Sequence, residues 1–179
     1  MSIRELGDRL IQWSAPLEIF WVSAWSESTL NAGTSDVRIC VFVEGDQYIL
    51  ETEERNGGAV FVMSSGDQTD IERYLVDSYG PQVRAALIPG APALTAAPYL
   101  APAPTGSTIP EGFTLTPSSD HPIRYVLSRP GSADDHVITF GARYEAEAFS
   151  EFAAIPVEEM KVRWMSAVPA ERHPPAGPM

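Results

Sequence analysis

Residues 37–80 constrain the fold most, because the spacing of their apolar side chains changes from every second residue to every third or fourth. Apolar residues alternate with others over residues 37–44, and a second alternating run covers 47–53. A third, short apolar run at 59–63 follows Asn56-Gly57-Gly58, which tolerates the positive φ of a tight turn. These runs predict three consecutive strands joined by hairpins.

A helical pattern follows the third run. Ile71, Tyr74, Leu75 and Ser78 recur at the spacing of one helix face. Thr69 with Glu72 three residues later predicts a capping box at the start of this helix. Gly80-Pro81 predicts its end, with a separate short helix over 81–88.

The rest of the chain divides around this unit. Ser2 and Glu5 predict a capped helix from residue 3, followed by a strand over 17–25 and a polar loop over 26–36. In the second half we expect strands near 113–115, 123–128 and 136–140, then helices over 144–154 and from 156. The domain prediction is an N-terminal αβ unit (1–88), a Pro/Ala-rich linker (89–111), a C-terminal βα unit (112–168) and a disordered tail (169–179). One continuous domain is the alternative.

A weak internal repeat links the halves. Tyr48-Ile49-Leu50 matches Tyr125-Val126-Leu127, and at the same offset Val60-Phe61 matches Val137-Ile138. The predicted fold class is therefore α+β, with a mostly antiparallel sheet, helices packed on one face, and two pseudo-repeated βββα units as a hypothesis.

Charge and composition limit the class of partner. The chain has 12 basic and 24 acidic residues and a formal net charge of -12. This charge disfavours nucleic acid and acidic membrane surfaces and suits a basic protein or a cationic ligand, although solubility alone would also explain it. Cys40 is the single cysteine, so no internal disulfide can form. We expect no membrane span and no signal peptide, and a cytoplasmic protein.

Catalytic and metal-binding motifs are absent from the sequence, so we predict no enzyme activity, no cofactor and no metal site. Asp134-Asp135-His136 is the nearest approach to a ligand cluster, but adjacent residues of a strand point to opposite faces. We interpret it as a solvated acidic loop. His121 and His173 are interpreted as ordinary exposed residues.

Two groups of residues are candidates for partner binding. Glu51, Glu53, Glu54 and Arg55 form a predicted acidic hairpin tip that could meet a basic partner. Trp21 and Trp25 would be anchors if exposed beside those acids. A solvated turn and core tryptophans are the alternative interpretations.

Several segments together carry a family resemblance. They are Asp70-Ile71-Glu72-Arg73-Tyr74-Leu75, Gly80, Val83-Arg84, the Pro-Gly exit after them, and Gly112-Phe113-Thr114-Leu115. With the length and the acidic, motif-free character, they resemble the TNT antitoxin family of actinobacterial immunity proteins. One member of that family neutralises the tuberculosis necrotizing toxin, an NAD-glycohydrolase. The resemblance implies a small cytoplasmic protein, monomeric when free, that binds a cognate toxin domain and occludes its active site; it assigns no site residue.

Two alternatives belong to other classes. An acidic secretion chaperone or adaptor would bind a segment of a partner protein and would bury the helix containing Met160 and Met165 in a homodimer. An enzyme would instead hold His121 or His136 in a deep pocket with an acid nearby.

Overall fold

The computed structural model describes residues 2–15, 20–22, 29–33, 37–54, 57–88, 90, 109–129 and 136–166. The described elements follow one another in this order: α1 (Ile3–Ser14), β1 (Phe20–Val22), β2 (Thr29–Gly33), β3 (Val37–Glu44), β4 (Gln47–Glu54), β5 (Ala59–Ser65), α2 (Gln68–Leu87), β6 (Thr114–Pro117), β7 (Tyr125–Ser128), β8 (Val137–Phe140), α3 (Arg143–Ser150) and α4 (Val157–Ser166).

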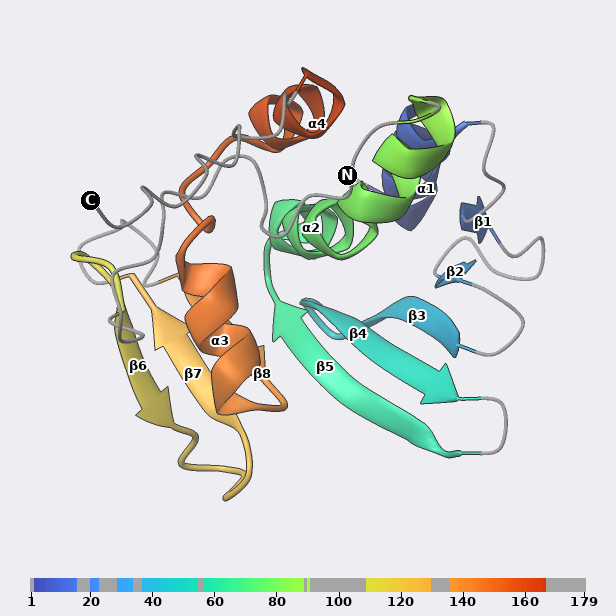
Figure 1. Ribbon diagram of the computed structural model, residues 1–179. Helices are drawn as coiled ribbons and strands as arrows, with labels where there is room; N and C mark the ends of the chain where they lie inside the picture. Colours follow the sequence, from blue (N-terminus) through green and yellow to red (C-terminus); the bar gives the residue numbers. More distant parts are fainter. Residues whose placement is uncertain are drawn as a thin grey trace, which may run out of the picture.

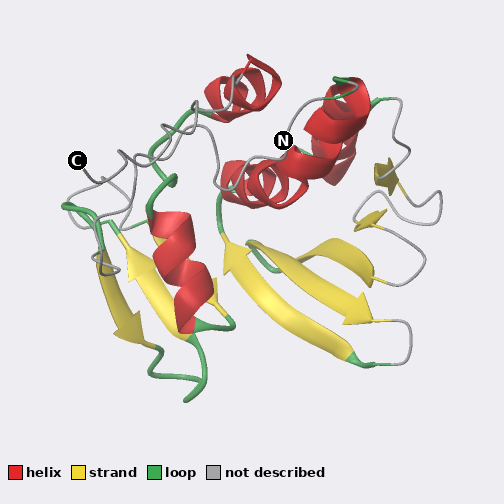
Figure 2. Cartoon of the chain, in the orientation of Figure 1, coloured by secondary structure: helices red, strands yellow, loops and turns green. Residues whose placement is uncertain are grey.

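The eight strands form one sheet in the order β1-β2-β3-β4-β5-β8-β7-β6, and each neighbouring pair is antiparallel. The helices cover one side of this sheet (Figures 1 and 2). Side chains from strands and helices meet there in one hydrophobic core that includes Leu10, Val41, Leu75, Phe149 and Met160. The predicted α+β class, with an antiparallel sheet and helices on one face, is confirmed.

The strands predicted from alternation are confirmed at β3, β4 and β5, but the prediction of a loop over 26–36 is wrong in part. Thr29–Gly33 forms β2, which pairs with both β1 and β3. Leu30 is its one large apolar residue, and it is fully buried opposite the equally buried Val41. Backbone pairing on both sides therefore stabilises a strand that side-chain alternation does not reveal.

Two predictions about helix α2 are wrong. Its N-cap is Asp67, whose side chain accepts from the Thr69 N–H, so Thr69 and Glu72 do not form a capping box. The helix also continues through Pro81 to Leu87. Gly80 serves close packing instead of termination, because a Cβ there would lie 2.1 Å from Cε2 of Trp164 in α4.

The order of the strands supports the internal repeat. β3-β4-β5 followed by α2, and β6-β7-β8 followed by α3, keep the same order in each half and meet at the β5–β8 pair. Met63 lies opposite Phe140, its own counterpart at the offset of the sequence repeat. A residue that faces its counterpart across an antiparallel pair marks a local pseudo-two-fold axis.

The second half follows the predicted order with shifted boundaries. Helix α3 is shorter than the predicted 144–154 helix, and α4, the helix predicted from residue 156, buries Val157, Met160 and Trp164. Most of the predicted linker and the whole predicted tail lie outside the described residues, so the domain boundaries remain predictions.

Candidate functional site

The face of the sheet opposite the helices carries the candidate residues Glu51 and Glu53. Strand register aligns Trp21, Asn31, Cys40, Glu51 and Phe61 in one row across β1 to β5. Directly opposed residues of antiparallel strands share a face of the sheet. The row therefore brings the backbone position of Trp21 into line with Glu51, although the two are far apart in the chain.

Glu51 and Glu53 lie within β4, before the connection to β5, and not in the turn itself. Glu51 is half-buried opposite Cys40, and Glu53 is exposed opposite Arg38. Glu54 is the last residue of β4. Trp25 and Arg55 lie outside the described residues. The binding role of all these residues remains a prediction.

The pKa of the Cys40 thiol reflects the electrostatic environment of this face. Burial raises the pKa of its thiol, and the negative charges of Glu51 and Glu53 raise that pKa further. The thiol is therefore kept in its neutral form, which opposes nucleophilic chemistry. The same shift shows that the two carboxylates act together on one small region.

Aromatic and basic groups extend the face toward the second half of the chain. The Arg124 guanidinium carbon lies 3.8 Å from the centroid of the Phe61 ring. Phe61 is placed by a register shift between Leu50 and Glu51, where Val62 becomes the extra residue of a bulge. We call the following residues the open face: Arg38, Cys40, Phe42, Ile49, Glu51, Glu53, Phe61 and Arg124.

A separate groove of about 540 Å³ lies between α1 and α4. Its lining comprises Arg9, Gln12, Trp13, Glu158, Lys161, Val162, Met165 and Ser166. This lining includes neither a histidine nor a cysteine, so the groove does not bring His121 or His136 to an acid within a pocket. It lacks the arrangement that the enzyme alternative requires.

The cations of the groove are held by a buried carboxylate. Glu72 of α2 accepts from Arg9 Nη2 at 2.6 Å and from Lys161 Nζ at 2.7 Å. Lys161 also donates to Glu158 at 2.9 Å. This network joins α1, α2 and α4 and has a structural role.

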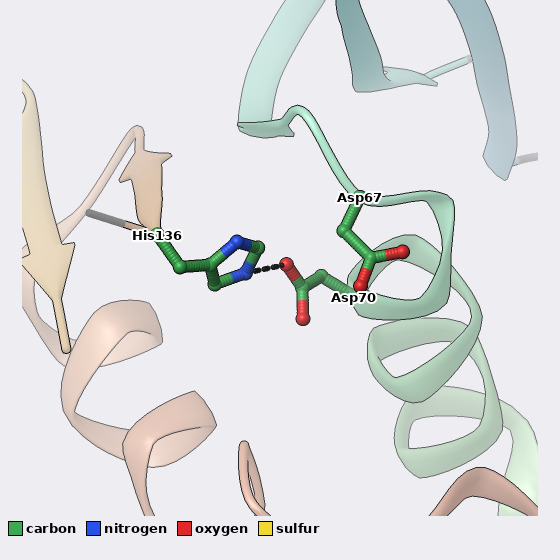
Figure 3. A group of neighbouring side chains, drawn as sticks. All are labelled: Asp67, Asp70 and His136. Carbon is green, nitrogen blue, oxygen red and sulfur yellow. Dashed lines mark hydrogen bonds and ion pairs between the residues drawn. The ribbon is translucent and has the colours of Figure 1, made fainter. Parts of the chain in front are cut away.

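A third cluster joins the two halves at the start of α2. His136 Nε2 lies 2.6 Å from Asp70 Oδ2, and the Asp67 carboxylate lies beside them (Figure 3). Asp70 also accepts from Ser65 Oγ at 2.6 Å and from Arg73 Nη1 at 2.8 Å. The sequence does not predict this cluster, because the acids next to His136 in the chain are Asp134 and Asp135 and no local signal links His136 to Asp70.

Comparisons with known proteins agree with the fold. A protein-family model described as Immunity protein 61 matches residues 13–163. The solved structure of Rv3902c from M. tuberculosis is similar, with a TM-score of 0.64 and 17% sequence identity over 90% of this chain and 87% of that chain. A comparison with curated protein sequences finds no match.

The family match confirms the sequence resemblance to an immunity-protein family. None of the described helices has the length and apolarity that crossing a membrane requires. Because the family model spans most of the sequence, the chain belongs to the Immunity protein 61 family.

Proposed function

We propose that this protein is an immunity protein that binds a cognate toxin domain of the NAD-glycohydrolase type and occludes its active site. The observation that carries the proposal is the family match over residues 13–163. The sequence resemblance to the TNT antitoxin family supports the toxin class. The protein would act in the cytoplasm, as a monomer before it meets the toxin, and would catalyse no reaction itself.

The open face is the proposed docking surface. Its acidic part, Glu51 and Glu53, suits a basic partner, as does the net charge of -12. Opposite charges speed the encounter of two proteins and select between partners. Phe42, Ile49 and Phe61 add apolar area to be desolvated on contact. The other predicted contacts, Trp21, Trp25, Glu54 and Arg55, belong to this proposal.

The chaperone alternative has less support. It expects α4 to bury its apolar side in a homodimer, but Met160 and Trp164 of α4 are already buried within the chain. Val162 is the large apolar side chain that α4 leaves exposed, at 63%. A single exposed apolar side chain is normal for a monomer surface.

The test uses candidate toxin domains encoded by genes that neighbour the gene of this chain. The purified pair is assayed for complex formation by calorimetry and for NAD hydrolysis with increasing amounts of this protein. We expect a 1:1 complex and loss of hydrolysis. If the wild-type protein neither binds nor inhibits neighbouring toxin domains, the proposal is wrong.

Paired variants test the docking surface separately. Glu53→Lys should lower the association rate about tenfold or more, because the attraction between the surfaces is weakened. Glu151→Lys is the matched control, since it makes the same change in net charge at an exposed residue that follows α3 on the helix side. Equal association rates for both variants would show that the interface lies outside the open face, and the proposed immunity role would not be affected.

A further inference from the structure

The cluster of Asp67, Asp70 and His136 has the composition of a metal site. Each residue offers one ligand atom, and these atoms all lie within 4.8 Å of one another. Imidazole nitrogen together with carboxylate oxygen suits zinc and similar divalent ions. We propose that these three residues bind one divalent transition-metal ion of the zinc class, independently of the proposed toxin binding.

The fold, and not the local sequence, brings the ligands together. Asp67 is the N-cap of α2, and Asp70 lies in the first turn of that helix. His136 directly precedes β8, which is held beside β5 by the pairing of Ser65 with Ile138. The site thus lies where the two halves of the chain meet, and an ion there would link them.

Protein donors already orient both carboxylates. The Thr69 N–H donates to Asp67 Oδ1 at 2.8 Å, and Arg73 Nη1 donates to Asp70 Oδ1 at 2.8 Å. One oxygen of each carboxylate is thereby fixed, and the second oxygen can act as a ligand. Ser65 Oγ, which donates to Asp70 Oδ2, also accepts from the Asp67 N–H. Such outer hydrogen bonds orient ligands in metal sites.

The exposure of two of the three ligands allows an ion to enter the cluster. Asp70 is 2% exposed and gives a fixed ligand, whereas the side chain of His136 is 35% exposed and Asp67 is exposed. The Nε2–Oδ2 distance of 2.6 Å must widen by roughly 0.5–0.8 Å to span two ligands of zinc at about 2.0–2.2 Å each. The His136 side chain, which is the more exposed of this pair, can make this movement.

A bound ion would be coordinated by Nε2 of a neutral His136 imidazole, whose single ring proton would lie on Nδ1, and any proton held between Nε2 and Asp70 Oδ2 would leave that position. The two carboxylate ligands, one of which also pairs with the Arg73 guanidinium, would offset the positive charge of the ion. A water molecule would complete a four-coordinate site. Magnesium and calcium fit less well, because they prefer oxygen ligands alone.

The test is a titration of the full chain with zinc sulfate, followed by calorimetry and thermal unfolding. We expect one ion per chain and a rise in Tm of about 3 °C or more at saturation. Cobalt should give the visible absorption of a four-coordinate ion. In ¹⁵N spectra, the resonance of His136 Nε2 should shift on zinc addition.

Two variants and one control locate the ion. Asp67→Asn keeps the helix cap, because asparagine caps as well as aspartate does, yet removes one anionic ligand. His136→Gln removes the nitrogen ligand. Both should lose at least tenfold in zinc affinity, whereas the control His121→Gln should not. The proposal is overturned if the dissociation constant of the wild-type protein for zinc is weaker than about 1 mM. It is also overturned if both variants bind zinc as tightly as the wild type does.

Discussion

At the scale of single residues, Cys40 shows how neighbours set chemistry. Its thiol lies between Asn31 and Glu51 in the row across the sheet. Burial and two carboxylates raise the pKa of the thiol above its ordinary value. Because the fold keeps the thiol neutral, the contribution of Cys40 to stability is fully present at pH values below the pKa of an unfolded cysteine. This contribution is lost as the pH rises from that value through the higher pKa of the folded state.

This residue allows a prediction about pH. In Glu51→Gln, the midpoint of the rate of Cys40 alkylation against pH should move to lower pH, because one nearby negative charge is removed. The rate is measured with iodoacetamide from neutral to alkaline pH. Glu44→Gln is the control, since Glu44 is not among the groups that shift this thiol. An unchanged midpoint in Glu51→Gln would contradict the assigned cause.

At the scale of elements, alternation and helical spacing predicted β3, β4, β5 and α1 well, including the Ser2–Glu5 capping box. The errors have physical reasons. β2 depends on pairing with two neighbours, and α2 passes Gly80-Pro81 because Trp164 packs against that glycine. Both depend on distant partners that no local pattern contains.

The same scale gives a prediction for helix packing. Glu72→Gln should lower the free energy of unfolding by about 2–4 kcal/mol, because it removes the charged partner of Arg9 and of the buried Lys161. Urea unfolding measures the change. Glu159→Gln is the control, because its pair with Arg163 is largely exposed and should cost about 1 kcal/mol or less. Equal losses of unfolding free energy in the two variants would show that the Glu72 network stabilises the protein no more than an exposed ion pair does.

At the scale of the whole molecule, the candidate sites could be predicted only in part. The acidic pair Glu51 and Glu53 was found from sequence because both lie in one strand. The contact of His136 with Asp70 could not be predicted from the sequence, because it joins residues that are 66 positions apart and that lie together only where the two halves meet. Long-range strand pairing has no local signature in a single sequence.

The meeting of the halves gives the third prediction. Gly141→Ala should destabilise the protein by about 3 kcal/mol or more, because the new Cβ would lie 2.3 Å from the Phe61 carbonyl oxygen, a backbone atom that cannot move alone. Thermal unfolding measures the loss. Gly66→Ala is the control, with 3.5 Å to its nearest neighbour atom. A native Tm in Gly141→Ala would show that β5 and β8 separate easily.

The pairing of Met63 with Phe140 has a consequence for assembly. Each half closes the hydrogen-bonding edge of the other, so either half expressed alone would leave one edge of β5 or β8 unpaired. An uncovered strand of this kind recruits another chain. Because the contact is self-complementary, a lone half would pair with a copy of itself, and the covalent link between the halves keeps that tendency within one molecule.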